Sequence, residues 1–108
     1  MIPAIQMNER RKAMNTTNQT KAHIIAGKYG FLHQREIFVE ECAEAIQAVQ
    51  KYKRNITAEN MLHIAEEVAD VIIMAEQIKH LIGDDTVETI IAQKLDRQLK
   101  RIEVEELC

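Results

Sequence analysis

Residues 60–82 form an almost continuously apolar segment, and this segment constrains the fold more than any other. Its aliphatic, alanine and methionine residues leave no broad polar face when they are projected on a helix. A helix of that kind must be covered by neighbours, so it belongs at the centre of a bundle. Aromatic residues make up only 4% of the chain, with 3 glycines and 1 proline, which favours helices over strands. We therefore predict an all-α fold, an antiparallel bundle of about four helices.

Capping residues locate the first two predicted helices. Residues 15–18 offer several N-caps for a helix that runs toward Tyr29, and Gly30 ends it. Residues 31–33 are expected to turn the chain into a second helix over residues 34–54. No strong N-cap marks the start of that second helix.

Similar signals locate the last two helices. Thr57 is a suitable N-cap for the apolar third helix, and Gly83 stops it. Asp85 and Glu88 have the spacing of a capping box, which would open a last helix over residues 86–105. Because the connections are short, consecutive long helices are predicted to lie antiparallel.

The length of 108 residues allows one domain with a modest core, and a chain this short often gains burial by oligomerising. We assign residues 1–18 to a polar N-terminal segment and residues 19–108 to the helical domain. Cys42 and Cys108 lie in no metal-binding or redox motif, so both are expected to be reduced thiols.

Charge and hydropathy exclude several classes of function. The formal net charge of -3 argues against a dedicated nucleic-acid-binding protein, which would need basic contacts to phosphates. The first fifteen or so residues contain no apolar run of signal-peptide length, and no later segment reaches the ~20 apolar residues of a membrane span. We therefore expect a cytoplasmic protein without membrane contact.

Two acidic clusters interrupt the apolar helices. The first is E-E-x-x-E at residues 40–44, and the second is E-E-x-x-D at residues 66–70. The i, i+3 spacing places Glu41 and Glu44 on one helix surface, and it does the same for Glu67 and Asp70. Each pair can therefore act as a pincer. Sequence alone also permits Glu66 to pair with Asp70 in place of Glu67, and this alternative stays open.

The helical projection puts some of these carboxylates among apolar residues. Glu41 falls inside the apolar arc of its helix, whereas Glu44 lies about 20° and Glu40 about 60° outside its edge. Glu67 falls between Met74 and Ile78. Ionised carboxylates in such places cost free energy unless their pKa values rise or a cation neutralises them.

An all-oxygen ligand set of this kind suits a hard divalent cation, Mg²⁺ or its substitute Mn²⁺. A second interpretation is that E-x-x-E pairs arise by chance in glutamate-rich helices and remain solvated. Two pairs that both intrude on apolar arcs favour the metal site. His63 lies one turn before Glu67, so it is either a neighbour that supports the ligands or an exposed helix histidine.

Basic residues line one flank of the last predicted helix. Lys94, Arg97 and Arg101 lie within roughly 60° of each other beside a stripe of leucine and isoleucine. They form either a solvated face or a clamp for phosphate oxygens. Lys51 and Lys53 near the end of the second helix carry the same two interpretations.

The pattern E-E-C-A-E at residues 40–44, followed by E-V-A-D at residues 67–70, resembles that of the MazG-like, all-α nucleoside triphosphate pyrophosphohydrolases. The flanking sequence KYGFLHQREIFVEECAEAIQAVQKYKR and HIAEEVADVIIMAEQI is similar to that family as well, so the likeness covers about residues 28–101. The resemblance implies a bundle completed by oligomerisation, as a homodimer or homotetramer, with sites made by more than one chain.

The resemblance also implies an activity. A (deoxy)nucleoside triphosphate would be cleaved between its α and β phosphates to the monophosphate and pyrophosphate, as nucleotide-pool housecleaning. The implied Mg²⁺ ligands are Glu41, Glu44, Glu67 and Asp70, and Glu40 would orient or deprotonate the attacking water.

Further residues are assigned on this implied reaction as candidate substrate-binding residues. Lys94, Arg97, Arg101 and Lys51 would face the phosphates, and Gln34 would face the ribose or base. Two other functions stay open: a helical module that binds metal and nucleotide without turnover, and a structural bundle that binds a partner.

Overall fold

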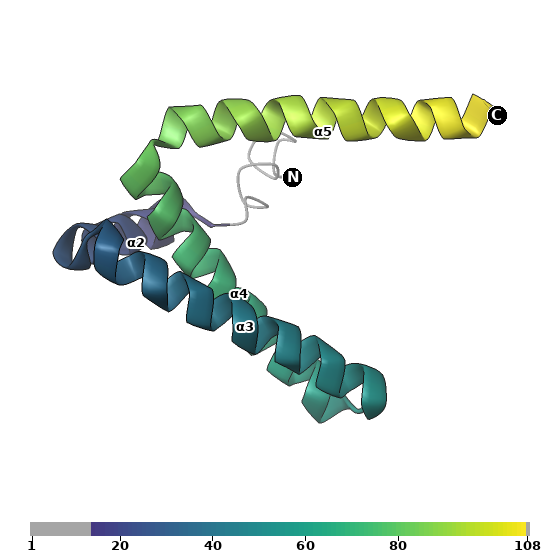
Figure 1. The fold of residues 1–108 in the computed structure, drawn as a ribbon, viewed down its shortest axis with the longest axis horizontal. Coiled ribbons are helices and arrows are strands. Elements are labelled where there is room, and N and C mark those ends of the chain that lie inside the picture. Colours follow the sequence, from purple (N-terminus) through teal and green to yellow (C-terminus); the bar gives the residue numbers. More distant parts are fainter. Residues whose placement is uncertain (1–13, 108) are drawn as a thin grey trace, which may run out of the picture.

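The computed structural model describes residues 14–107, and every regular element in that range is an α-helix (Figure 1). The four helices are α2 (Thr16–Tyr29), α3 (Phe31–Arg54), α4 (Ala58–Ile82) and α5 (Asp84–Leu107). The prediction of an all-α fold with about four helices is therefore confirmed for the described residues. Most of the predicted N-terminal polar segment, together with Cys108, lies outside them.

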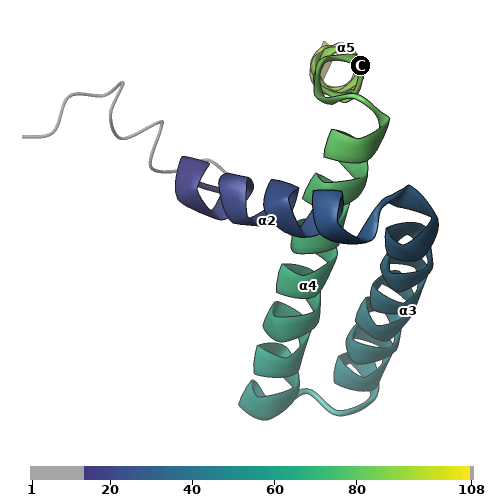
Figure 2. The ribbon, with the colours of Figure 1, turned by 90° about the vertical axis from the view of Figure 1, so that its left-hand side faces the viewer.

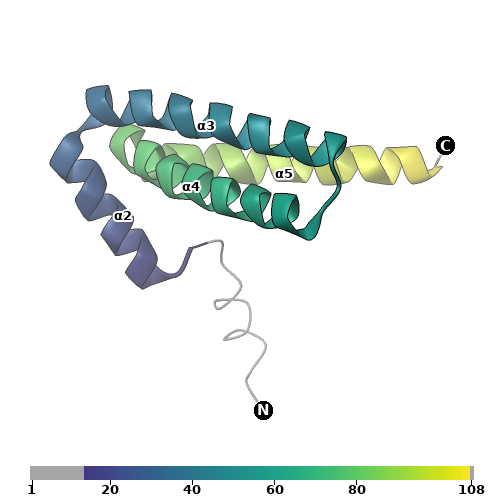
Figure 3. The same cartoon turned by 90° about the horizontal axis from the view of Figure 1, so that it is seen from below.

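Helices α3 and α4 form an antiparallel hairpin, and the two helices lie side by side in the ribbon views (Figures 1, 2 and 3). Helix α2 crosses α4 near the end of the hairpin that is opposite the α3–α4 connection (Figure 2). Helix α4 contacts α2, α3 and α5, so it is the central element, as its sequence predicted. No described helix has the length and apolarity that crossing a membrane requires.

Small residues allow α2 to approach the hairpin closely. Ala22 and Ala26 lie four residues apart on one face of α2, and both are buried. Ala48 on α3 and Met74 on α4 are the other buried apolar residues of the described core. Such a small core leaves much of the apolar surface of α4 uncovered within one chain.

A buried polar contact joins α3 to α4. The Gln34 side chain is 4% exposed, and its Nε2 donates a hydrogen bond of 2.7 Å to Gln77 Oε1. The ring of His33 lies beside it, with Nδ1 at 2.6 Å from Gln34 Oε1. Because a buried amide must find partners, this pair fixes how the two helices sit against each other.

Two predicted N-caps are present. The Asn15 side chain accepts a hydrogen bond of 2.9 Å from the Asn18 amide at the start of α2. Thr57 Oγ1 accepts one of 3.0 Å from the Asn60 amide at the start of α4. The Asn60 side chain also donates to the Asn55 carbonyl at 2.8 Å, so the α3–α4 connection is held from within.

Two predicted boundaries are wrong. Residues 31–33 do not form a turn, because Gly30 alone turns the chain at φ 80° and α3 begins at Phe31. The predicted capping box of Asp85 and Glu88 is also absent, since α5 begins at Asp84 and Asp85 already lies in its first turn. The Glu88 carboxylate instead lies 2.7 Å from Lys79 Nζ on α4.

Helix α5 does not lie along the bundle. It approaches only α4 among the described helices, and it has no buried residue along its length. Figure 1 shows α5 diverging from the α3–α4 hairpin after α4 ends at Ile82. Within one chain the bundle therefore consists of α2, α3 and α4, and α5 is an extended arm.

Candidate metal centre

The antiparallel hairpin brings the two acidic clusters together midway along α3 and α4. Glu41 on α3 and both Glu67 and Asp70 on α4 each offer a carboxylate oxygen, and these oxygens lie within 4.8 Å of one another. The arrangement follows from the sequence, because opposed i, i+3 pairs on paired antiparallel helices face each other. We call Glu41, Glu44, Glu67 and Asp70 the acidic cluster.

Part of the acidic cluster is withdrawn from solvent without a hydrogen-bond partner. Glu41 Oε2 and Glu67 Oε2 are buried oxygen atoms that accept no hydrogen bond within the described residues. The Glu67 side chain is 14% exposed, although it is a carboxylate. Buried acceptors are normally satisfied, so these two oxygens call for a cation or a proton.

The pKa values of the acidic cluster also indicate that it needs a cation or a proton. Burial raises the pKa of Glu41, and the nearby carboxylates of Glu44, Asp70 and Glu67 raise it further. Burial also raises the pKa of Glu67, with added repulsion from Glu44 and Asp70 that His63 partly offsets. Without a cation the folded protein therefore resists full ionisation of these two side chains.

The structure separates Glu66 from Glu67. The Glu66 side chain is 64% exposed and faces His63, whose Nδ1 lies 3.7 Å away, whereas Glu67 joins Glu41 and Asp70. The same imidazole reaches Glu67, with Nε2 at 3.9 Å from Oε1. His63 thus lies beside one predicted ligand. Of the two pairings that the sequence left open, the structure forms the one with Glu67.

Glu40 is exposed on α3, next to Glu41 and outside the group of converging oxygens. Glu44 is exposed as well, at the edge of the cluster, where its charge acts on both Glu41 and Glu67. A residue at such an edge can contact water and a bound cation together. The assigned roles of both residues remain predictions.

The structure does not bring the predicted substrate-binding cations to the acidic cluster of the same chain. Lys94, Arg97 and Arg101 lie exposed on α5, and Lys51 lies exposed in the last turn of α3. None of them forms an ion pair with the acidic cluster in the described part of the chain. Arg97 and Arg101 instead line a shallow depression along α5.

Gln34 also lies away from the oxygens of the cluster. It is buried near the start of α3, and its amide is engaged with Gln77 and His33. A contact between Gln34 and a nucleotide would require this amide to exchange partners. That contact remains a prediction.

Sequence reasoning gave no role to a second group of ionisable residues, where α2, α4 and α5 meet. His23, His80 and Asp84 offer ligand atoms within 4.8 Å of one another there. The i, i+4 spacing of His80 and Asp84 is visible in the sequence, but Gly83 breaks the helix between them. The approach of His23 depends on how α2 crosses α4.

Comparison of the chain with protein-family models, with curated protein sequences and with solved structures finds no match. Any functional conclusion therefore depends on the residues of this chain and on the pattern that they form.

Proposed function

We propose that the chain is a Mg²⁺-dependent nucleoside triphosphate pyrophosphohydrolase that cleaves between the α and β phosphates of a (deoxy)nucleoside triphosphate. The observation that carries the proposal is the convergence of Glu41, Glu67 and Asp70 on one point between α3 and α4, with two buried oxygens that lack partners. The E-E-x-x-E and E-x-x-D patterns, which resemble those of MazG-like enzymes, support the choice of reaction.

The residues present fit a hard divalent cation. The ligand atoms are carboxylate oxygens, which Mg²⁺ and Mn²⁺ prefer, and the two unpartnered oxygens would gain a counter-charge. In the proposed site Glu41, Glu44, Glu67 and Asp70 hold the ion. A bound divalent ion would neutralise polyphosphate charge and lower the pKa of coordinated water.

The roles of the other residues follow from their positions. Glu40 is exposed beside the cluster, so it can orient a water molecule or accept a proton from that water without being a ligand of the metal ion. His63 would hold Glu67 in place through its imidazole nitrogen. Lys94, Arg97, Arg101 and Lys51 would bind phosphate oxygens.

We also propose that the active assembly is a homodimer or homotetramer. Helix α5 carries an exposed apolar stripe, in which Leu95, Leu99 and Ile102 are 53%, 60% and 49% exposed. The radius of gyration is 17.0 Å, whereas a compact domain of about 108 residues would have about 13 Å. A second chain that covers α5 would bury this surface and would place α5 cations near another chain's carboxylates.

The test is pyrophosphate release from a panel of canonical and damaged (d)NTPs in Mg²⁺. We expect Glu41→Gln and Asp70→Asn to lose at least about 100-fold in turnover, because each removes a ligand charge. Glu66→Gln is the matched control, since this exposed glutamate lies outside the cluster. Circular dichroism checks that all three variants remain folded.

The outcomes separate the competing functions. Full activity in both ligand variants would contradict the site assignment. Binding of Mg²⁺ and nucleotide without turnover in the wild-type protein would indicate a non-catalytic binding module. A melting temperature that responds neither to Mg²⁺ nor to EDTA would indicate a structural or partner-binding bundle, because an ion that binds only the folded state must stabilise it.

A further inference from the structure

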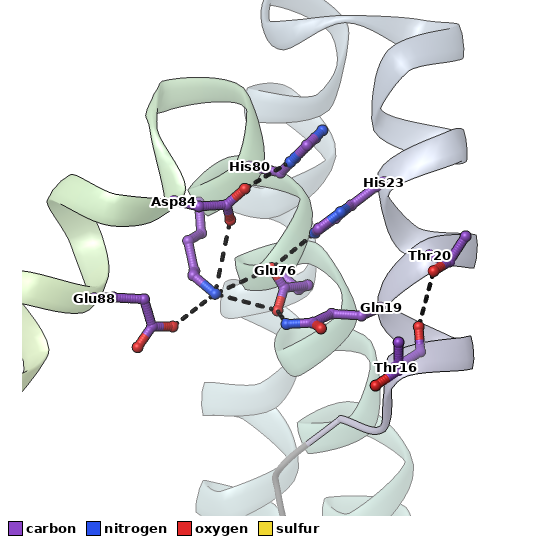
Figure 4. A network of polar contacts seen from close by, with 9 residues as sticks. Thr16, Gln19, Thr20, His23, Glu76, His80, Asp84 and Glu88 are labelled. Carbon is purple, nitrogen blue, oxygen red and sulfur yellow. Dashed lines mark hydrogen bonds and ion pairs between the residues drawn. The ribbon is translucent and has the colours of Figure 1, made fainter.

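A second polar cluster lies about 9 Å further along α4 than Asp70, where α2, α4 and α5 meet. It joins His23 of α2, three residues of α4 and two of α5 (Figure 4). We call this group the junction cluster: His23, Glu76, Lys79, His80, Asp84 and Glu88. It shares no residue with the proposed catalytic site, and its chemistry is independent of that site.

The junction cluster contains two stacked imidazole rings, each of which contacts a carboxylate. The rings of His23 and His80 stack with their centroids 3.7 Å apart and an angle of 8° between their planes. His23 Nε2 lies 3.2 Å from Glu76 Oε2, and His80 Nδ1 lies 2.8 Å from Asp84 Oδ2. Both carboxylates also form ion pairs with the Lys79 ammonium. Each of the two rings therefore has one nitrogen within hydrogen-bond distance of a carboxylate oxygen.

The junction cluster holds more negative charge than its lysine neutralises. Lys79 Nζ lies 2.7 Å from Glu88, 3.4 Å from Glu76 and 3.7 Å from Asp84, so one ammonium serves three carboxylates. Burial alone would raise the pKa of Glu76, but hydrogen bonds from Gln19, His23 and Lys79 hold it below its usual value. With neutral imidazoles, two negative charges remain uncompensated. Asp84 Oδ1 is also a buried oxygen without a hydrogen-bond partner in the described structure.

We propose that His23, His80 and Asp84 bind one divalent transition-metal ion of the Zn²⁺ type. The three named residues offer ligand atoms within 4.8 Å of one another. In a tetrahedral zinc site with bonds of ~2.0–2.1 Å, neighbouring ligand atoms lie about 3.4 Å apart. The observed distance of 2.8 Å between His80 Nδ1 and Asp84 Oδ2 is of that order, and the ligand atom of His23 lies within 4.8 Å of both residues' ligand atoms.

The donor set decides which class of ion binds. Imidazole nitrogen suits Zn²⁺, Cu²⁺ or Ni²⁺, whereas Mg²⁺ prefers oxygen ligands alone. The ion would replace the hydrogen-bond proton between His80 and Asp84, and each ligating neutral ring would carry its proton on the nitrogen that does not bind the ion. One divalent charge would also balance the two uncompensated carboxylates. The acidic cluster and the junction cluster thus have different ion preferences.

The position of the site gives it a structural consequence. His23 belongs to α2, His80 to the last turn of α4, and Asp84 to the first turn of α5. A bound ion would tie the start of the α5 arm to the helix that crosses α4. The site would therefore set the direction of α5, whose contacts with the rest of the described chain are otherwise few.

The test is calorimetric titration of the metal-free, untagged full chain with Zn²⁺ in excess Mg²⁺, which fills the acidic cluster. We expect one equivalent to bind, and we expect His23→Gln and His80→Gln to weaken binding at least about 10-fold. His63→Gln is the matched control, because this histidine lies beside the acidic cluster and should leave zinc affinity unchanged. The readout is ion binding, so it is independent of nucleotide hydrolysis.

A second measurement avoids any loss of fold in the variants. On the wild-type chain, substoichiometric Zn²⁺ should shift the imidazole NMR signals of His23 and His80 and leave that of His33 in place. Absence of zinc binding in excess Mg²⁺, unchanged affinity in both histidine variants, or shifts confined to His63 would each overturn the proposal.

Discussion

At the scale of single residues, the acidic cluster combines burial with like charge. Glu41 and Glu67 each have a buried oxygen without a partner, and neighbouring carboxylates raise the pKa of both side chains. Such side chains destabilise the folded state whenever they are ionised without a counter-ion. The effect makes the stability of the folded protein depend on pH, and on metal if the proposed ion binds.

The first prediction concerns that pH dependence. In the unfolded chain Glu41 and Glu67 titrate near 4.5, and in the metal-free folded protein their pKa values are higher. The folded state therefore holds more protons just above pH 4.5, so this contribution to the free energy of unfolding falls as pH rises. We expect the melting temperature in EDTA to fall as pH rises above 4.5, and Mg²⁺ to restore it.

The matched control is the Glu41→Gln/Glu67→Gln double variant, in which the profile over this range should be flatter and the response to Mg²⁺ should be lost. Glu76 and Asp84 act in the opposite direction, because their pKa values are lowered and their contribution is lost only as pH falls below the usual values. Identical pH profiles in the wild type and the double variant would contradict the prediction.

At the scale of helices, two glycines with positive φ set the directions of the chain. Gly30 has φ 80° between α2 and α3, and Gly83 has φ 129° between α4 and α5. Residues with a Cβ rarely adopt these conformations, so each glycine fixes a corner that few other residues would permit. Gly27 differs, since it lies inside α2 with open space where a Cβ would be.

The second prediction follows from this difference. Gly83→Ala should lower the free energy of unfolding by about 1–3 kcal/mol, because alanine is strained at that φ. Gly27→Ala, the control, should raise it by about 1 kcal/mol, because alanine favours the helix interior. Chemical denaturation followed by circular dichroism measures both. Equal effects of the same sign would show that backbone conformation at Gly83 does not limit stability.

The helix boundaries also show how much of the secondary structure can be predicted from the sequence. Asn15, Thr57 and Gly83 act as predicted, because caps and stops are made by side chains or by a glycine that neighbouring residues identify. The predicted capping box failed because α5 already begins at Asp84, and the Glu88 carboxylate instead pairs with Lys79 on another helix. A charged contact of that kind depends on how α4 and α5 meet.

At the scale of the whole molecule, the α5 arm is the feature that one chain does not explain. A long helix with an apolar stripe is only marginally stable when that stripe is exposed to water, because most of the stability of a helix in a protein comes from packing of its apolar face. A second copy of the chain that pairs along α5 would supply that packing. The proposed assembly therefore concerns the stability of α5 as well as the proposed active site.

The third prediction tests the assembly. Leu99→Glu should shift the proposed oligomer toward monomer, because it places a charge in the middle of the exposed apolar stripe. Gln93→Glu lies on the side of α5 opposite the stripe and serves as the control with the same introduced side chain. Sedimentation velocity measures both. A wild-type protein that is monomeric at all accessible concentrations would contradict the prediction, as would an oligomer that Leu99→Glu leaves intact.

The sequence by itself determined the all-α class, the main helix caps and the facing of the two acidic pairs. These depend on local spacing and on short connections, which act over a few residues. The tertiary structure decided that Glu67 rather than Glu66 joins Glu41, that Gln34 is buried against Gln77, that His23 meets His80 and Asp84, and that α5 leaves the bundle. These outcomes depend on helix crossing and rotation, which many weak contacts far apart in the sequence set together.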